Sequence, residues 1–350
     1  MFENQRGISV ERYAPERKEV WDRFVNASKN ATFLFYRDYM DYHSDRFTDH
    51  SLLIAKDREL LAVLPANLTT DNTLISHQGL TFGGLVVSTG AALADVLESL
   101  QAGLEFLHTQ GIEKIIYKRI PRFYSTLPDD EVDYALFLLE ARLSRRDCAL
   151  VIAQQNRLPL RKGRKSEISK ARRFGVRVVE EVDFAPFWER VLVPRLSNRY
   201  GVKPVHSLAE ITLLASRFPQ NIRQFSAYCG DQILAGTTIF ETPLVAHAQY
   251  SGVTEEGQKV GALDAVYGWL LSERYKDKRY FDFGICNDRD GRLLNHGLLS
   301  WKEAFGGRSY VHDFYEVAAR NFSRLEPVLP PRSAAVVAEP LETVEVNNLP

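Results

Sequence analysis

The sequence contains few cysteines. Among 350 residues there are only three, Cys148, Cys229 and Cys286. They form neither a Cys-x-x-Cys pair nor another spacing typical of a metal site, and their odd number does not indicate a disulfide framework. We therefore expect free thiols in a reducing compartment.

Metal-binding histidine pairs and nucleophile motifs are also missing. The eight histidines never occur in the His-x-His or His-x-x-x-His spacing that often binds a metal ion, so we predict no metal site. The sequence has no Gly-x-Ser-x-Gly motif, and no cysteine lies in a recognisable base-paired setting. Any group transfer is therefore expected to proceed by direct attack, without a covalent enzyme intermediate.

Long apolar runs and an excess of one charge sign are absent as well. No run approaches the ~18 apolar residues that a membrane span needs, and the first residues show no apolar signal core. The 44 Lys and Arg residues balance 45 Asp and Glu residues, which leaves a net charge of -1. Such a balance exerts no strong overall attraction on nucleic acids or membranes. These features predict a cytoplasmic protein without membrane insertion.

The two halves of the chain share one order of predicted elements. Residues 52–64 and 225–236 each read as a strand, a polar turn and a second strand. A third strand, a periodic amphipathic helix and a further apolar strand follow each hairpin, at 74–76, 91–109 and 114–117 and again at 245–252, 262–275 and 280–283. The repeat predicts a mixed α/β chain of two domains with a duplicated βββαβ core.

A strongly basic segment lies between the halves. From Arg157 to Arg177, nine Lys or Arg residues accompany a single acid, Glu167. Residues 166–174 can form a helix that Gly175 ends. The cations, Arg172 among them, could bind the phosphates of a nucleotide, CoA or tRNA. A solvated linker helix is the alternative interpretation.

Two apolar strands of the second half carry polar candidates. Strict alternation along 244–252 places His247, Gln249 and Ser251 on one face and Tyr250 on the other, with Ala246 and Ala248. His247 can titrate near neutral pH, and Tyr250 lies at the strand end. We predict both as catalytic residues, although a structural histidine and a tyrosine of the core fit the same pattern.

An acid interrupts the aromatic strand 279–285. Burying Asp282 costs free energy unless the carboxylate is paired or functional, so we predict a base or an anchor for a substrate amine, with a hydrogen-bonded structural aspartate as the alternative. Asn287 begins the next loop and is predicted to bind a cofactor. In the helix 291–305, Lys302 and His296 lie off the apolar stripe and are predicted as a catalytic and a substrate-binding residue.

The first half offers further substrate contacts. His77 and Lys118 are predicted to face the cleft between the domains. Gly83 and Gly84 are predicted to let the backbone approach a ligand closely, since a glycine pair leaves room there.

The segment from Arg279 to Val317 resembles the closing part of the C-terminal domain in Fem-type tandem GNAT acyltransferases of the Acetyltransferase-6 family. Their Phe-Lys-x-x-Phe-Gly motif matches Trp301 to Gly306, with tryptophan in place of the first phenylalanine. The resemblance covers most of residues 8–320, and it implies that Lys302 stabilises charge at the reacting acyl group. The domain organisation that follows is an N-terminal GNAT-like domain at 1–155, a basic linker helix at 156–178, a C-terminal GNAT domain at 179–326 and a flexible tail at 327–350.

The resemblance implies an N-acyltransferase with acyl-CoA as co-substrate and a small primary amine as acceptor. A nucleotide-linked amino sugar for surface polysaccharide is the specific expectation. Ordinary GNAT enzymes bind the CoA pyrophosphate with Gln/Arg-x-x-Gly-x-Gly/Ala before the central helix. Here Gly261 fits that pattern but Leu263 does not. A helix amino terminus behind Gly261 can still accept phosphate, and Lys259 is predicted to assist.

Two other functions remain open. Some Fem-type proteins use aminoacyl-tRNA as donor and a peptidoglycan precursor as acceptor, which predicts salt-dependent RNA binding. This chain lacks a heptad run long enough for the coiled-coil arm that some of them carry. A non-catalytic binding protein with the same fold is the third interpretation, and the sequence leaves homo-oligomerisation open.

Overall fold

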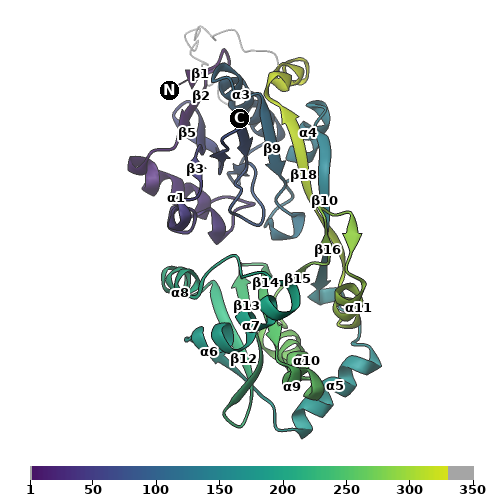
Figure 1. Ribbon diagram of the computed structural model, residues 1–350. Helices are drawn as coiled ribbons and strands as arrows, with labels where there is room; N and C mark the ends of the chain where they lie inside the picture. Colours follow the sequence, from purple (N-terminus) through teal and green to yellow (C-terminus); the bar gives the residue numbers. More distant parts are fainter. Residues whose placement is uncertain (1, 330–350) are drawn as a thin grey trace, which may run out of the picture.

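Two long strands, β10 (Arg142–Ala153) and β18 (Arg308–Ala318), connect the two halves of the molecule (Figure 1). They pair with each other antiparallel. On its other side β10 pairs with β15 (Tyr280–Ile285) of the second half, and β18 pairs with β9 (Lys114–Lys118) of the first. One 11-stranded sheet therefore runs through both halves of the computed structural model, which describes residues 2–329.

The large sheet belongs to both halves of the chain, and a second, smaller sheet belongs to the first half. The large sheet has the order β11-β12-β13-β14-β15-β10-β18-β9-β7-β6-β3. The bounds of its other strands are β11 (Arg177–Glu181), β12 (Ile222–Cys229), β13 (Gln232–Glu241), β14 (Val245–Val253), β7 (Thr73–Ile75), β6 (Asn67–Leu68) and β3 (Thr48–Asp49). A five-stranded sheet in the first half consists of β1 (Phe2–Glu3), β2 (Ile8–Arg12), β4 (Leu52–Lys56), β5 (Glu59–Leu64) and β8 (Val86–Val87).

The duplicated core is present in both halves, so the predicted fold class is confirmed. The hairpin β4–β5 of the first half corresponds to β12–β13 of the second. In the first half α3 (Leu93–Thr109) connects the parallel pair β7 and β9, and in the second half α10 (Ala262–Trp269) connects the parallel pair β14 and β15. Parallel neighbours need such a crossover, because a tight turn can only reverse the chain.

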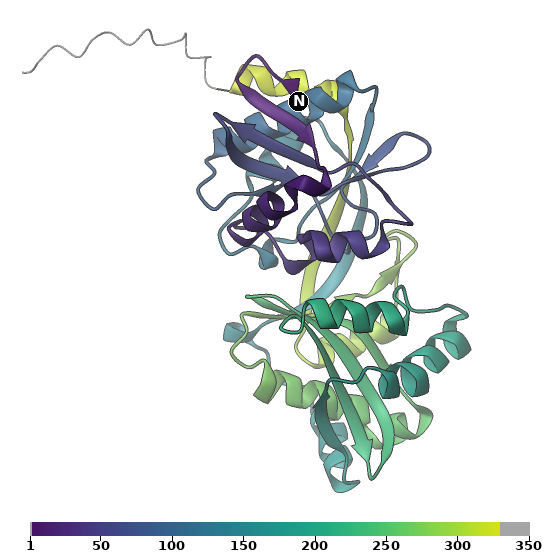
Figure 2. The same ribbon diagram turned by 90° about the vertical axis from the view of Figure 1, so that its left-hand side faces the viewer.

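The remaining helices cover the sheets, mostly on the outside (Figure 2). Their bounds are α1 (Lys18–Asn26), α2 (Arg37–Met40), α4 (Glu131–Leu138), α5 (Lys162–Arg173), α6 (Ala185–Phe187), α7 (Val193–Tyr200), α8 (Leu208–Arg217), α9 (Glu255–Val260) and α11 (His296–Ala304). Short 3₁₀ segments are η1 (Pro15–Arg17), η2 (Phe33–Phe35), η3 (Asp41–His43), η4 (Arg122–Tyr124), η5 (Gln154–Asn156) and η8 (Ala319–Val328), and π-helical turns are η6 (Trp188–Leu192) and η7 (Leu270–Arg274).

The last helix is shorter than predicted. Residues 291–295 do not belong to it, because Leu293 and Leu294 form strand β17 of a small hairpin with β16 (Asn287–Asp288). Gly291 makes the turn possible: it has a φ of +86°, and a Cβ atom there would lie 1.9 Å from the carbonyl oxygen of Arg146. The amide of Asn295, directly before α11, donates to the carbonyl oxygen of Cys286 at 2.8 Å, which fixes the start of α11 near the end of β15.

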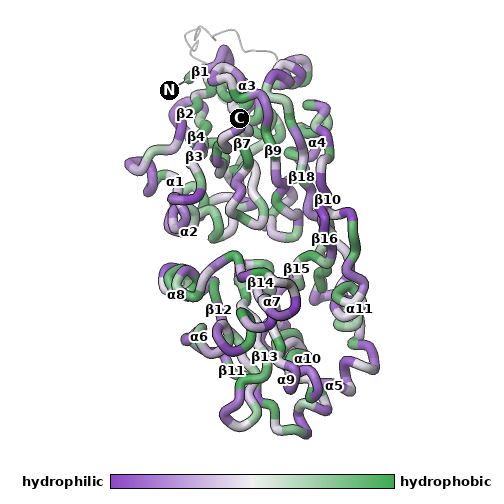
Figure 3. The backbone as a smooth tube through the Cα atoms, viewed as in Figure 1, coloured by the Kyte–Doolittle hydropathy of each residue, from purple (hydrophilic) through white to green (hydrophobic). Residues whose placement is uncertain are grey.

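An apolar interior continues across the two halves. Phe33 of the first half lies 5.6 Å from the ring of Phe218 and 5.5 Å from that of Phe240, both of the second half. In Figure 3 the strands of the interior, such as β12 and β13, are mainly hydrophobic and the outer helix α7 is hydrophilic. The burial of such rings contributes roughly 2–3 kcal/mol each, which favours a fixed arrangement of the two halves.

The basic helix α5 packs against α10. Ala171 is fully buried. A Cβ atom at Gly261 would lie 2.6 Å from the Glu167 carbonyl oxygen, and one at Gly268 would lie 2.7 Å from the Ile168 side chain. The two glycines thus let the helices approach closely. The interpretation of this segment as a solvated linker is therefore wrong for its inner face, while its outer face carries the exposed cations.

The predicted tail begins inside η8. Leu325 and Leu329 at this end of the described chain are buried, and Arg6 pairs with Glu326 at 3.0 Å. Residues 330–350 of the predicted tail lie outside the described part of the chain.

Candidate functional site

Strands β14 and β15 diverge, and two pockets adjoin the segment where they part. The strands pair over only three positions, from Val245↔Tyr280 to His247↔Asp282. A pocket of about 760 Å³, here called the basic pocket, lies between β14, α5, α7, α9, α10 and α11. A pocket of about 570 Å³, here called the cleft pocket, lies between the two halves of the chain. Phe283 of β15 lines both.

A β-bulge controls which side chains of β14 reach each pocket. The register with β13 shifts between Thr238↔Tyr250 and Ile239↔Ala248, so Gln249 is the extra residue. Beyond the bulge, each side chain of β14 points to the face of the sheet opposite to the one that strict alternation predicts. Ser251 lines the basic pocket with its hydroxyl 2.6 Å from that of Tyr267. Tyr250 instead packs on Trp188. The predicted alternation along this strand is therefore wrong beyond Gln249.

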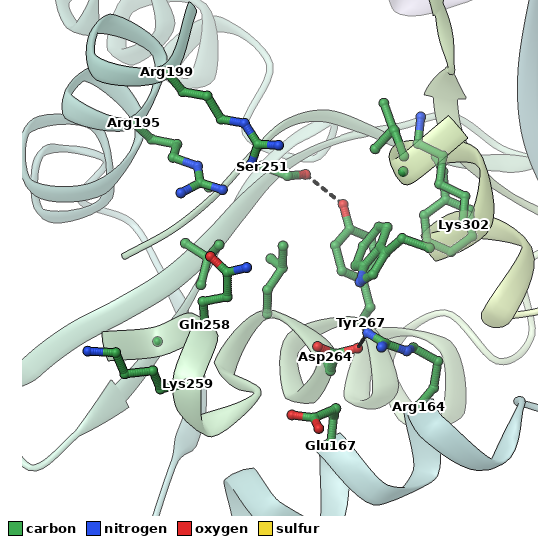
Figure 4. Close-up of a pocket in the computed structure, with 18 of the residues that line it drawn as sticks. Arg164, Glu167, Arg195, Arg199, Ser251, Gln258, Lys259, Asp264, Tyr267 and Lys302 are labelled. Atoms are coloured by element: carbon green, nitrogen blue, oxygen red, sulfur yellow. Dashed lines mark hydrogen bonds and ion pairs between the residues drawn. The ribbon is translucent and has the colours of Figure 1, made fainter. Parts of the chain in front are cut away.

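The basic pocket is lined by more cations than anions (Figure 4). Two carboxylates, Glu167 and Asp264, face six cationic side chains, and these are Arg164, Lys170, Arg195, Arg199, Lys259 and Lys302. Arg164 forms an ion pair with Asp264, and Lys170 lies 3.8 Å from Glu167. Figure 4 shows the guanidinium groups of Arg195 and Arg199 extending from α7 toward the space opposite Gln258. The pocket therefore presents a positive field to a ligand.

The segment before α10 forms a short helix in place of a glycine-rich loop. Thr254 caps α9 by accepting a hydrogen bond from the Gly257 amide at 3.0 Å. Gly257 packs on β13, where a Cβ atom would lie 2.3 Å from the Leu234 carbonyl oxygen. Of the two residues predicted here, Lys259 lines the basic pocket, whereas Gly261 packs on α5 and lines neither pocket.

Lys302 joins α11 to the end of β15. Its ammonium group donates to the carbonyl oxygens of Gly284 at 2.9 Å and Ile285 at 2.6 Å. Burial lowers the pKa of Lys302 to about 8, although the nearby Asp282 carboxylate opposes this shift. The side chain also lines the basic pocket. It therefore holds the backbone at the point where the strands diverge.

Asp282 is the centre of a fully buried polar network. Its Oδ2 accepts a hydrogen bond from the Tyr124 hydroxyl at 3.1 Å and lies 2.8 Å from Nδ1 of His247. Its Oδ1 accepts from the Gly284 amide at 2.7 Å. Burial raises the pKa of Asp282, but His247 and the Gly284 amide outweigh it and hold the pKa at about 2. Asp282 lines neither pocket, so its contacts suit the positioning of His247 better than direct contact with a substrate.

The depressed pKa of Asp282 predicts a pH-dependent stability. Its contribution to the free energy of unfolding is present above the unfolded-state pKa of about 4 and is lost as the pH falls toward about 2. The expected loss is roughly 2 kcal/mol. Urea unfolding at a series of pH values checks this, and Asp282→Asn should flatten the acid limb. An unchanged acid limb in the variant would contradict the assignment.

Two imidazoles lie at the cleft pocket. His247 lines it and directs Nδ1 toward Asp282, which leaves Nε2 as the nitrogen available to a ligand. His312 of β18 also lines it, and among residues 2–329 its Nε2 has no hydrogen-bond partner. Burial lowers the pKa of His312, which favours the neutral ring. An imidazole whose Nδ1 is held by a carboxylate, as that of His247 is by Asp282, can accept a proton at Nε2.

Residues of the first half form the opposite wall of the cleft pocket. Lys118 lines this wall, as predicted for a residue facing the cleft. His77 does not line it: the ring is buried against His43 at 5.4 Å, and burial lowers its pKa to about 3. Gly83 and Gly84 are also outside the lining. A Cβ atom at Gly83 would lie 1.7 Å from the Ser76 carbonyl oxygen, so tight backbone packing accounts for this glycine.

Four other predicted residues lie outside both pockets. The Tyr250 hydroxyl accepts a hydrogen bond from the His206 amide at 3.3 Å. Asn287 is buried and donates to Asp147 at 2.9 Å, which ties the loop to β10. His296 and Arg172 are exposed on α11 and α5. None of the four lines either pocket.

Sequence reasoning missed Tyr124, His312 and Arg195. His312 is the single histidine of its strand, but that strand also carries Arg308, Asp313 and Glu316, so His312 stands out less than His247 does. Tyr124 and Arg195 lie in segments without a comparable pattern. Among the described residues, no group of three or more His, Cys, Asp or Glu side chains could hold a metal ion. No helix between residues 2 and 329 has the length and apolar character needed to cross a bilayer.

Known structures share this architecture. FemX superimposes with a TM-score of 0.61 at 11% identity, covering 91% of this chain and 99% of that one. L-PGS from Bacillus licheniformis gives 0.53 at 13% identity over 92% and 99% of the two chains. A tandem GNAT protein from the clavulanic acid biosynthesis pathway gives 0.50 at 13% identity over 89% and 98%. No family model and no curated protein matches the sequence. The chain thus has the Fem-like tandem GNAT fold.

Proposed function

We propose that the protein is an N-acyltransferase that moves an acyl group from acyl-CoA in the basic pocket to a primary amine in the cleft pocket. One observation carries the proposal: both pockets adjoin the diverging strands, and Phe283 lines both of them. An acyl donor and an amine could therefore approach each other from opposite sides. The Fem-like tandem GNAT fold, shared with FemX, supports an acyl-transfer reaction.

His247 is the proposed base. Its Nε2 would take a proton from the ammonium form of the acceptor, which leaves the neutral amine, while Asp282 holds Nδ1 and stabilises the imidazolium that forms. The neutral amine nitrogen then attacks the thioester carbonyl carbon. As the C–N bond forms the C–S bond breaks, the second proton of the nitrogen passes to the thiolate, and the proton on His247 leaves for solvent. Direct attack in a ternary complex needs no enzyme nucleophile.

The developing oxyanion needs a hydrogen-bond donor. Beyond His247, the edge of β14 that faces β15 makes no ladder pair with it. Amide groups along this edge are suitable donors, because this part of β14 lines both pockets. Lys302 donates to two carbonyl groups and can direct its third N–H toward the basic pocket.

The donor contains phosphates in this proposal, and Arg195 is expected to bind them. Arg195→Met should weaken binding of acetyl-CoA about 10- to 100-fold, because a charge-assisted hydrogen bond contributes roughly 1.5–3 kcal/mol. Isothermal titration with acetyl-CoA, longer acyl-CoAs and free CoA measures this. Arg172→Met is the matched control, since Arg172 is exposed and outside the pocket. Equal affinities for the two variants, or no binding of any CoA by the native protein, would contradict the donor assignment.

Aminoacyl-tRNA is the second candidate donor. The observation that favours it is the extension of positive charge beyond the basic pocket along the exposed face of α5, which includes Lys162, Lys165, Arg172 and Arg173. Phosphates of an RNA acceptor stem could follow such a surface. In that case Arg172→Met should weaken RNA binding and reduce its salt dependence. The transfer chemistry at the diverging strands would be the same.

The acceptor in this proposal is a nucleotide-linked amino sugar of surface polysaccharide synthesis. The cations Lys118 and Arg145 and the ring of Phe314 on the wall of the cleft pocket support an acceptor of mixed polar and aromatic character. An acyl-transfer assay with amino sugars, free and nucleotide-linked, tests this choice.

A further inference from the structure

Lys118 is a buried lysine without a carboxylate partner. Its residue is only 6% exposed, and no Asp or Glu oxygen of the described chain forms a salt bridge with it. The ammonium group donates to the carbonyl oxygens of His77, at 3.1 Å, and Leu80. Two of its three N–H groups are thereby used. The side chain lines the cleft pocket, where the third N–H can meet a ligand.

The surroundings of Lys118 leave its charge uncompensated. Asp147, an acid that lines the same pocket, accepts hydrogen bonds from Arg145 at 2.8 and 3.0 Å and one from Asn287 at 2.9 Å. Arg145 itself adds positive charge, and both cations lie over the ring of Phe314, at 4.6 Å for Arg145 and 5.8 Å for Lys118. A buried charge is costly unless it is paired. An anion in the cleft pocket would supply the missing pair.

We propose that Lys118 binds an anionic group, a carboxylate or a phosphate, that the amine acceptor itself carries. This inference rests on the proposed acyl transfer, since it places the acceptor in the cleft pocket. His247 and His312 of the same pocket would face the amine, and Lys118 would face the anion. The second half of the chain would thus supply the base, and the first half would supply the recognition of the acceptor.

The proposal predicts that anion binding and protonation of Lys118 are coupled. Burial lowers the pKa of Lys118 to about 7, with Arg145 acting in the same direction and Asp147 opposing it. His77, which adjoins the ammonium group, stays neutral at this pH because burial lowers its pKa to about 3. A bound anion stabilises the ammonium form and raises the pKa of Lys118. Affinity for the anion should therefore fall as the pH rises through about 7.

A direct binding experiment tests the anion site without any acyl transfer. In the full chain with ¹³C-labelled lysines, the Lys118 signal, assigned with Lys118→Met, is titrated with pH in the absence and presence of inorganic phosphate or succinate. We expect a midpoint near 7 that moves upward with either anion. Arg195→Met keeps this response, which separates the cleft pocket from the basic pocket. A midpoint that neither anion moves overturns the proposal, whether or not the protein proves to be an acyltransferase.

Kinetics then separate recognition from a merely structural role and distinguish the two sources of the anion. Paired acceptors are used that differ only in the anion, such as glucosamine with glucosamine 6-phosphate and an alkylamine with an amino acid. For the anionic member we expect Lys118→Met to raise KM about 10- to 100-fold with kcat retained, and for the neutral member little change. An equal effect on both members of each pair overturns the assignment. A structural tie between Lys118 and the 77–80 loop would act on all acceptors alike.

Discussion

Replacement of His247 by alanine should lower kcat for acyl transfer about 10²- to 10⁴-fold, the usual contribution of a positioned general base. The affinity for the acyl donor should stay unchanged, because His247 lines the cleft pocket and not the basic pocket. Steady-state kinetics and donor titration measure the two effects separately. At high pH, where more of the amine is already neutral, the loss should become smaller.

A control variant and a second variant test whether the loss of rate is specific to His247. His296 is exposed and outside both pockets, so His296→Ala should keep the native rate. Asp282→Asn should lower kcat as well, because an amide at the position of Oδ2 no longer stabilises an imidazolium at Nδ1 2.8 Å away. If His247→Ala retained a third or more of the native kcat, deprotonation by His247 would be ruled out, and a water chain would have to carry the proton.

The second large effect is expected on stability. Arg119→Met should reduce the free energy of unfolding by about 3–5 kcal/mol, because it leaves a buried carboxylate without its partner. Arg119 donates to Asp129 at 2.9 Å and to Asp133 at 3.1 Å, and Asp129 is only 1% exposed. Two carbonyl groups, those of Ile120 and Asp129, complete its contacts. Urea unfolding of the full chain measures the change.

The neighbouring Arg122 supplies the control. It pairs with Asp130 at 2.8 Å and with Asp133 at 3.1 Å, yet its side chain is 65% exposed. Exposed pairs contribute about 0–1 kcal/mol, so Arg122→Met should change the stability little. Equal losses in both variants would show that burial is not the cause. The loop between Arg119 and Asp129 carries Tyr124, so Arg119→Met should also disturb the hydrogen bond from Tyr124 to Asp282.

The duplicated order of elements was predictable because it depends on local patterns. The helices of both cores follow apolar spacings of three and four residues, and the strands follow apolar runs bounded by turns. The predictions were wrong where a single residue interrupts the regular alternation of a strand or the periodicity of a helix. The bulge at Gln249 exchanged the faces of Tyr250 and Ser251, and the turn at Gly291 shortened α11. Gln249 carries no signal of a bulge in a single sequence, whereas Asp290-Gly291 is a turn dipeptide that could have shown the end of the predicted helix.

The candidate site was predictable only in part. Asp282 was singled out because a buried acid is costly unless it is paired or functional, His247 because an imidazole can titrate near neutral pH, and Lys302 because it matches the lysine of the Fem-type motif. Their partners come from distant segments: Tyr124 lies 158 positions from Asp282 along the chain. Arg195 and His312 reach the pockets from α7 and β18. Gly83 and Asn287 were predicted from a glycine pair and a loop position, but Gly83 serves close backbone packing and Asn287 ties its loop to Asp147 of β10.

The sequence by itself determined the local elements, their repetition and the residue types available for acyl-transfer chemistry. Only the tertiary structure decided that β18 lies between β9 and β10, that β14 and β15 diverge beyond Asp282, and that Lys118 is buried without a counter-charge. The physical reason is the distance along the chain over which each interaction acts. Propensity and periodicity act between neighbours along the chain, whereas burial, charge pairing and pocket shape arise from contacts between segments that the sequence holds far apart.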